Sequence, residues 1–273
     1  MDSVRNIEIM GIVNLTDDSY FADSRCLDLK AALERTRALL DEGADIIDVG
    51  ACSTRPGAEP VGADEEWRRL EPFLKAAVSE FPGICLSIDT YWASVVRNAY
   101  DLIGEFIVND ISAGEADEDM LSTVGLLKLP YIAMHMRGDS KTMQSLTDYK
   151  SVTEEVVAYF KAFSEKAAAH GIVRWILDPG FGFAKNIDQN YQLLQELSQF
   201  QKVVCADGTS PRILAGVSRK SMIYKKFGIT PEEVLPATQV LHLKAIMEGA
   251  SILRVHDVAE AKRTVCLYNA LFL

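Results

Sequence analysis

The chain has 273 residues, of which 48% are hydrophobic and 25% are charged, and its formal net charge at pH 7 is −11. This length suits one large α/β barrel or two smaller domains, and the composition excludes a largely disordered protein. Because nucleic acids and anionic membranes select basic surfaces, neither is expected as a partner of so acidic a chain.

Eight short apolar runs, taken in chain order, predict β-strands. They cover residues 9–13, 46–50, 85–88, 106–108, 131–134, 175–177, 213–217 and 251–253. Runs that are apolar at nearly every position are typical of strands buried on both faces, as in a parallel sheet.

Segments with helical patterns alternate with these runs, at residues 29–42, 64–80, 92–100, 117–127, 152–170, 188–200, 231–248 and 258–270. Strands and helices that alternate without a linker or a composition break predict one domain over residues 1–273, an α/β fold of the TIM (β/α)₈ barrel type. The active site of such a barrel lies at the carboxyl ends of its strands.

A polar residue closes or follows nearly every apolar run. In chain order these residues are Asn14, Asp48, Asp89, Asn109 with Asp110, His135, Asp178, Ser218, and Arg254 with His256. Since the carboxyl ends of parallel strands meet on one side of a barrel, we expect these groups to converge on a single site.

Three of these residues, Asp89, Asn109 and Asp178, carry hydrogen-bond acceptors. Acceptors held in an apolar barrel mouth suit a flat heterocycle that presents several N–H groups on one edge, such as a pterin or a purine. The alternative for each residue is that it caps the following helix, since Asp and Asn are favoured at that position.

Cationic residues follow the last two strands. The segment Ser218-Arg219-Lys220-Ser221 follows the seventh strand, and Arg254 and His256 end the eighth, where alternation directs both side chains into the same space. Anion sites in such barrels are frequently built from these two loops, so an anionic ligand group is expected. The alternative is that these cations pair with carboxylates.

Asn14 ends the first strand, which adjoins the eighth in a closed barrel. Its carbonyl oxygen suits Mg²⁺ when a diphosphate supplies further oxygens, although a cap or turn role remains the alternative. Two long strand-to-helix loops, at residues 15–28 and 51–62, are either lids over the barrel mouth or surface insertions. In residues 178–183, Phe181 and Phe183 are either core residues or a wall for an aromatic ligand.

The chain begins Met1-Asp2-Ser3-Val4-Arg5, without the apolar run of a signal peptide, and no stretch is long enough to span a membrane. Its five cysteines are scattered, with no Cys-x-x-Cys and no histidine at metal-ligand spacing. We therefore expect reduced thiols, no zinc site and a cytoplasmic protein without membrane attachment.

Taken together and in order, several motifs make the chain resemble the dihydropteroate synthase family over almost its whole length. They lie at residues 10–16 (MGIVNLT), 47–50 (IDVG), 53–57 (STRPG), 87–90 (SIDT), 108–110 (VND), 134–138 (MHMRG), 178–183 (DPGFGF), 216–221 (GVSRKS) and 254–256 (RVH). The resemblance implies that 4-aminobenzoate condenses with 6-hydroxymethyl-7,8-dihydropterin diphosphate to give 7,8-dihydropteroate and diphosphate, in folate biosynthesis.

The resemblance also implies a role for each matching residue. Asp89, Asn109, Asp178 and Lys220 would hold the pterin, with Met134 and Phe183 lining its slot and Arg254 covering its face; Asp89, Asp178 and Lys220 are the candidate catalytic residues. Asn14, Arg254 and His256 would bind the diphosphate together with Mg²⁺, which Asn14 would ligate. Thr54, Arg55, Pro56 and Ser221 would form the aminobenzoate site, where sulfonamides compete in this family.

The chemistry of the reaction agrees with these roles. An arylamine is a weak nucleophile, so departure of the diphosphate from the methylene carbon is the difficult step, and Mg²⁺, Arg254 and His256 would stabilise its charge. Asp89 and Asp178 would stabilise the cationic pterin methylene that remains, so no strong general base is required. Ordered loops would exclude water from this cation.

Some residues depart from the family pattern. The first long loop has Asp17 after Thr16, Tyr20 where Phe is usual, and Ala22-Asp23-Ser24 where Asp-Gly-Gly is typical, which changes its allowed backbone states. Cys52 replaces a customary Glu, and Ala184 stands where Gly is commoner.

The resemblance implies a homodimer, for which apolar residues in the segments 231–248 and 258–273 offer a surface. Two other functions remain as alternatives. One is a pterin-binding domain that transfers a methyl group from methyltetrahydrofolate to a corrinoid protein, and the other is a synthase-like barrel that binds pterin without turnover.

Overall fold

Eight parallel strands form a closed barrel in the order β1-β2-β3-β4-β5-β6-β7-β8. The computed structural model describes residues 6–15, 25–52, 61–139 and 141–272. The strands are β1 (Glu8–Asn14), β2 (Ile46–Gly50), β3 (Leu86–Asp89), β4 (Ile107–Asp110), β5 (Tyr131–Met134), β6 (Ile176–Asp178), β7 (Arg212–Ala215) and β8 (Ile252–Val255). The predicted TIM barrel is thereby confirmed.

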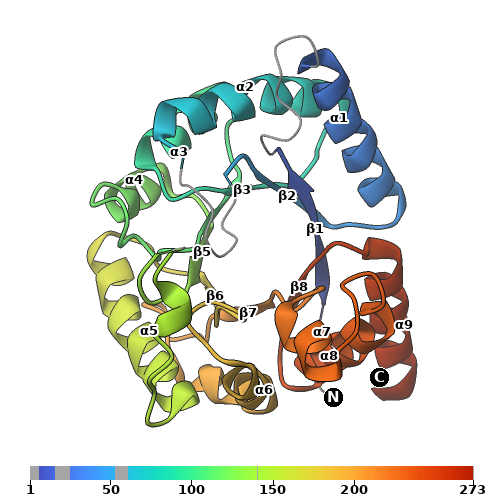
Figure 1. Cartoon of the computed structure of the whole chain (residues 1–273). Helices are drawn as coiled ribbons and strands as arrows, with labels where there is room; N and C mark the ends of the chain where they lie inside the picture. Colours follow the sequence, from blue (N-terminus) through green and yellow to red (C-terminus); the bar gives the residue numbers. More distant parts are fainter. Residues whose placement is uncertain (1–5, 16–24, 53–60, 140, 273) are drawn as a thin grey trace.

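Helices surround the barrel on the outside (Figure 1). They are α1 (Arg25–Asp41), α2 (Ala63–Glu80), α3 (Ala93–Ile103), α4 (Met120–Leu127), α5 (Val152–Ala169), α6 (Ile187–Gln195), α7 (Ser221–Phe227), α8 (Leu235–Met247) and α9 (Val258–Phe272), with 3₁₀ turns η2 (Met143–Ser145) and η3 (Leu197–Lys202). Among the described helices, none is both long enough and apolar enough to cross a bilayer.

The helix predictions needed four corrections. The helix predicted at residues 29–42 begins earlier, since α1 starts at Arg25, inside the predicted loop 15–28. The predicted helix 188–200 is split into α6 and η3, and the predicted helix 231–248 begins only at Leu235, where Pro236 occupies the first turn. The short helix α7 was not predicted, because seven residues are too few for helical periodicity to show.

Two layers of apolar side chains stabilise the fold. The larger lies between the sheet and the helices and includes the fully buried Phe73, Tyr131, Phe160 and Phe200. The smaller lies inside the barrel and consists of Met10, Ile46, Ile107, Ile132, Ile176, Leu214 and Ile252. This inner layer fills the lower barrel, so a ligand site must lie above it, at the carboxyl ends of the strands.

Candidate active site

A second layer of inward residues lies directly above the inner apolar layer. Because side chains alternate along a strand, the residue two positions after each inner apolar residue points into the same space. From β2, β4, β5, β6 and β8 this rule selects Asp48, Asn109, Met134, Asp178 and Arg254. Four of the polar residues predicted to converge, Asp48, Asn109, Asp178 and Arg254, therefore do share one layer, together with Met134, which the family resemblance assigned to the pterin slot.

The same alternation turns two predicted residues away from the site, and here the prediction of convergence was wrong. Asp110 follows Asn109 and bonds outward to the Tyr131 hydroxyl at 2.6 Å and to the backbone nitrogen of Ser112 at 2.7 Å. His135 follows Met134 and packs edge-on against Tyr159, with ring centroids 4.8 Å apart. Both are buried structural residues.

Asp48 is a residue of this layer to which the sequence reasoning gave no ligand role. Its carboxylate is fully buried and accepts hydrogen bonds from the Ser87 hydroxyl at 2.6 Å and the Asn109 amide at 3.2 Å. Asp48 thereby fixes the orientation of Asn109. Its place two residues after Ile46 was the signal that could have identified it.

Arg254 reaches across the barrel mouth to two carboxylates. Its Nε lies 2.6 Å from Asp48 Oδ2, and its Nη2 lies 3.0 Å from Asp89 Oδ2. Neither bond uses Nη1, which has no partner among the residues that the structure describes. Asp89, which is expected to hold the heterocycle, and Arg254, which is expected near the anion, thus lie side by side.

Three acceptor oxygens at the strand ends stay open. Asp89 uses only Oδ2, Asp178 uses only Oδ1, which accepts from the backbone nitrogen of Gly180 at 2.8 Å, and Asn109 uses only its amide nitrogen. Within the described part of the chain, Asp89 Oδ1, Asp178 Oδ2 and Asn109 Oδ1 have no donor. The capping alternative is wrong for all three, since Trp92, Asp119 and Asn186 precede the helices α3, α4 and α6.

Burial shifts the titration of the charged groups. It raises the pKa of Asp89 to about 7, opposed by Arg254 and reinforced by the negative charge of Asp48. It lowers the pKa of Lys220 to about 8, opposed by Asp178. Burial, with the positive charge of Arg254, also lowers the pKa of His256 to about 4, so this imidazole is neutral at pH 7.

Lys220, from the loop after β7, contacts the loop after β6. Lys220 Nζ donates to the Phe181 carbonyl and lies 4.6 Å from the centroid of the Phe183 ring. The Phe181 side chain is fully buried in the core, whereas Phe183 is partly exposed beside the lysine. These two rings were predicted to be either core residues or a wall for an aromatic ligand. Phe181 is a core residue, and Phe183 is available to contact a ligand.

Lys185, which the sequence reasoning missed, holds this loop in shape. Its Nζ is buried within 3.0 Å of three acceptors: the Gly180 carbonyl, the Phe183 carbonyl and His135 Nδ1. Gly180 has φ +73° and lies so close to the His135 carbonyl that any Cβ would come within 2.0 Å of that oxygen. No pattern in the sequence distinguishes this lysine from the surface lysines.

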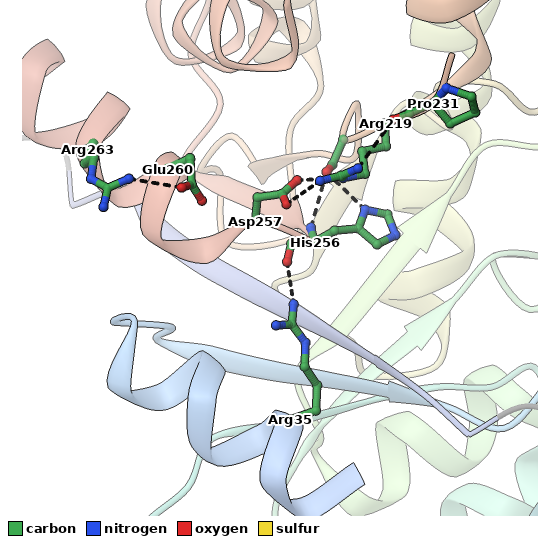
Figure 2. Close-up of polar contacts among 8 residues, drawn as sticks. Arg35, Arg219, Pro231, His256, Asp257, Glu260 and Arg263 are labelled. Carbon is green, nitrogen blue, oxygen red and sulfur yellow. Dashed lines mark hydrogen bonds and ion pairs between the residues drawn. The ribbon is translucent and has the colours of Figure 1, made fainter. Parts of the chain in front are cut away.

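The loops after β7 and β8 contact each other through side chains (Figure 2). Ser218 Oγ lies 3.0 Å from His256 Nδ1, and Arg219 makes two bonds to the Asp257 carboxylate at 2.8 and 2.7 Å. Ser218 had been predicted to close the seventh strand. Because β7 ends at Ala215, Ser218 instead lies three residues beyond the strand.

The remaining predicted residues fall into two groups. Asn14 ends β1 with an exposed side chain, Met134 ends β5 buried, and Ser221 begins α7. Thr54, Arg55 and Pro56, with the loop departures Asp17, Tyr20, Ala22, Asp23 and Ser24, lie outside the described residues.

A metal at this site would have few protein ligands. No group of three or more His, Cys, Asp or Glu side chains that could hold an ion occurs in the described ranges. A single exposed amide such as that of Asn14 fits a cation whose other ligands are substrate oxygens and water, which is how Mg²⁺ commonly binds. The donor set therefore fits Mg²⁺ bound together with a diphosphate.

Comparisons with known proteins agree with this geometry. A family model described as "Pterin binding enzyme" matches residues 10–256. The chain is 39% identical over 261 residues to the dihydropteroate synthase of Synechocystis, covering 94% of this chain and 87% of that protein. It is 37% identical over 264 residues to the dihydropteroate synthase of Escherichia coli, covering 96% of this chain and 90% of that protein.

Other relatives are much longer. A folic acid synthesis protein of Schizosaccharomyces pombe is 37% identical over 266 residues, covering 96% of this chain but only 36% of its own length. This chain therefore spans about a third of the length of that relative.

Solved structures give the same result. A Yersinia pestis dihydropteroate synthase with a sulfonamide drug complex is 34% identical and has a TM-score of 0.88. The match covers 97% of this chain and 94% of that chain. A dihydropteroate synthase from a Clostridium species, solved in the presence of pteroic acid, has 34% identity and a TM-score of 0.88, with 100% of this chain and 99% of that chain covered.

Proposed function

This chain belongs to the dihydropteroate synthase family of pterin-binding enzymes, and we propose that it catalyses the reaction of that family. In this reaction, 4-aminobenzoate replaces the diphosphate of 6-hydroxymethyl-7,8-dihydropterin diphosphate, giving 7,8-dihydropteroate and diphosphate. The observation that carries the proposal is the set of three open acceptors on β3, β4 and β6 beside the cations of the last two loops.

The open acceptors match the pterin in chemistry. A pterin presents its ring N–H and amino groups along one edge, and Asp89, Asn109 and Asp178 present oxygens to receive them. Met134 and Phe183 would line the slot, with Lys220 at its rim. Hydrogen bonds from neutral N–H groups to carboxylates are stronger than those between neutral partners, so the two aspartates would supply most of the affinity.

The reaction breaks the bond between the methylene carbon and the diphosphate oxygen and forms a bond from that carbon to the amine nitrogen, which loses a proton. Arg254, through Nη1, and His256 would hold the leaving diphosphate, and the carboxylates of Asp89 and Asp178 would stabilise the positive charge left on the pterin methylene. Neutral His256 contributes a hydrogen bond here and not a charge.

We include Mg²⁺ in this proposal, with Asn14 as its protein ligand. When bound, the ion would neutralise charge on the diphosphate. Asn14 ends β1, which pairs with β8 through Met10 and Arg254, so its amide and the guanidinium lie on neighbouring strands. This arrangement supports a shared anion between them.

Aminobenzoate would bind Ser221 together with Thr54, Arg55 and Pro56. Ser221 is adjacent in sequence to Lys220, so an aminobenzoate bound at Ser221 would lie beside the rim of the pterin slot. Neither alternative function gains support from the comparisons, whose named relatives are synthases of dihydropteroate or folate.

We also propose a cytoplasmic homodimer. The described cysteines Cys85, Cys205 and Cys266 are free thiols, which supports a reducing compartment. Large apolar side chains on α8 and α9 are exposed: Val240, Met247, Leu267, Leu271 and Phe272. An apolar surface of this kind is typical of a dimer interface. Light scattering should give twice the chain mass, and a monomer at all concentrations would disprove the dimer.

The test of the function is a coupled assay for diphosphate release that depends on 4-aminobenzoate. We expect turnover with the native chain and its loss in Lys220→Ala and Asp178→Ala. Lys226→Ala is the matched control, because Lys226 is exposed on α7 and its contacts are an ion pair with the exposed Asp188 and the Tyr191 ring, away from the site residues. Unchanged turnover in both site variants would remove the assigned pterin site, and its absence in the native chain would leave a binder without turnover.

A further inference from the structure

Two side-chain pairs extend the junction of β7 and β8 beyond the last paired backbone residues. Backbone pairing of these strands ends at Ala215 and Leu253. Further along, Ser218 contacts His256, and the next residue of each loop, Arg219 and Asp257, form an ion pair. Consecutive residues of one loop therefore pair with consecutive residues of the other (Figure 2).

The Ser218 hydroxyl makes two contacts with one residue. Its oxygen accepts from the backbone nitrogen of His256 at 3.2 Å and lies 3.0 Å from Nδ1 of the same histidine. The hydroxyl has one proton, and no other acceptor for it exists among the described residues. Because Ser218 is buried, that proton is best placed on the bond to Nδ1.

A neutral imidazole that accepts at Nδ1 carries its proton on Nε2. His256 is only partly buried, and its Nε2 has no partner within the described part of the chain. The charged groups around the ring are Arg254, Asp257, Arg219 and Lys220, three cations and one anion, which disfavour a second proton on it. The tautomer therefore decides whether Nε2 donates or accepts.

The Arg219–Asp257 pair fixes the position of Ser218. Arg219 has φ +53°, a left-handed conformation that is uncommon for a residue with a side chain, and its guanidinium binds both oxygens of Asp257. Arg35 of α1 donates to the His256 carbonyl at 2.5 Å from the opposite side. The backbone around His256 is thus held from two elements.

We propose that Ser218 is a positioning residue that sets His256 in the tautomer with Nε2–H, so that this nitrogen donates a hydrogen bond to the departing diphosphate. The Arg219–Asp257 pair holds Ser218 in place for this role. The inference rests on the proposed function, because it assigns the diphosphate to His256. With the opposite tautomer, a lone pair would face the anion and repel it.

Isotope-labelled histidine nitrogens read the tautomer directly by nuclear magnetic resonance. The chain has four histidines, and His256→Gln identifies the signal of His256. We expect protonated Nε2 and unprotonated Nδ1 in the native chain and in Ser218→Thr, which keeps the hydroxyl, and a mixture of tautomers in Ser218→Ala. A native ring protonated at Nδ1, or no change in Ser218→Ala, would overturn the proposal.

Affinity for inorganic diphosphate with Mg²⁺ tests the consequence for binding. We expect Ser218→Ala to weaken it about tenfold, the size of one lost hydrogen bond to a charged group, and Ser218→Thr to restore most of it. Affinity for 7,8-dihydropteroate, which lacks the diphosphate, should stay within about twofold of the native value. An equal loss for both ligands would mean that Ser218 only stabilises the fold.

Coupling between the residues separates this inference from the function itself. Once His256→Gln is present, Ser218→Ala should cause no further loss of diphosphate affinity, whereas independent losses would contradict the proposal. Asp257→Asn should weaken diphosphate binding, and the matched control Arg263→Gln, which removes an exposed ion pair with Glu260 on the same helix, should not. If native turnover is present but this coupling is absent, the inference fails and the proposed function stands.

Discussion

Arg254 and Asp48 are separated by 206 residues in the sequence, yet the guanidinium Nε lies 2.6 Å from a carboxylate oxygen that is fully buried. This contact joins β8 to β2 across the barrel mouth. Asp48 in turn holds Asn109, so one buried carboxylate orients both a cation expected near the leaving group and an acceptor expected at the pterin. Asp48 therefore connects the proposed pterin site to the proposed diphosphate site through hydrogen bonds to Asn109 and Arg254.

Removal of the Asp48 charge should therefore affect stability as well as binding. Asp48→Asn leaves Arg254 with Asp89 as its remaining partner, and since Arg254 is 24% exposed, we expect a loss of about 2 kcal/mol in the free energy of unfolding, below the usual cost of breaking a buried pair. Urea denaturation measures it. Asp188→Asn, which removes an exposed pair with Lys226, is the control and should change stability by less than about 0.5 kcal/mol.

Lys185 should be needed for the shape of the loop after β6. Lys185→Met removes three hydrogen bonds to buried acceptors, so we expect a loss of at least about 2 kcal/mol in unfolding free energy and a raised KM for the pterin diphosphate. Lys161→Met, on the exposed side of α5, is the control. A Lys185→Met chain with native stability and native KM would show that the loop does not depend on this lysine.

Glu66 should make stability depend on pH. Its side chain is fully buried, and neither carboxylate oxygen has a partner at hydrogen-bond geometry among the described residues. Burial raises its pKa from 4.5 to about 7, opposed by the nearby Thr90 hydroxyl and by Arg69. A raised pKa means that the folded chain binds the proton on Glu66 more tightly than the unfolded chain does. The contribution of this proton to the free energy of unfolding is therefore fully present below pH 4.5 and is lost as the pH rises through about 7.

Glu66→Gln should remove this dependence. The variant should be more stable than the native chain at pH 8, by up to about 3 kcal/mol, and nearly equal to it at pH 4. Thermal or urea unfolding across this range measures the difference. If the two proteins keep the same difference in stability at both pH values, Glu66 does not titrate as its burial requires.

Turnover should rise and then fall with pH. Asp89 accepts hydrogen bonds as a carboxylate, so kcat/KM for the pterin diphosphate should increase as the pH passes about 7, and it should decrease above about 8 as Lys220 loses its proton. Lys220→Arg, whose guanidinium stays charged, should lose the upper limb at a reduced rate. An upper limb that persists in this variant would belong to another group.

The strands were predicted from continuous apolar runs, and the site from the polar residues that close or follow these runs. Asp89, Asn109, Asp178 and Arg254 were placed in the site on this basis, and Met134 through the family resemblance. Alternation of side chains along a strand turns Asp110, after Asn109, and His135, after Met134, outward. The predicted fourth strand ended at residue 108, whereas β4 continues to Asp110, so the orientation of Asp110 was not fixed. The predicted strand 131–134 coincides with β5, so alternation along it was the signal that could have identified the orientation of His135.

Other features have no local signal in the sequence. Lys185 is buried because three acceptors surround it, and those acceptors come from a loop and a strand brought together only by the fold. The pairs Ser218–His256 and Arg219–Asp257 each join residues 38 positions apart, and they form because β7 and β8 are neighbours in the barrel. Tertiary arrangement, and not propensity, determines such contacts.

The most direct test of the central claim is a calorimetric titration with 6-hydroxymethyl-7,8-dihydropterin, which carries the heterocycle without the diphosphate. If the open oxygens of Asp89, Asn109 and Asp178 grip this ring, the native chain binds it, and Asp178→Ala loses about ten- to a hundredfold in affinity, the cost of charge-assisted hydrogen bonds. Equal affinity in the native chain and in Asp178→Ala would contradict the account.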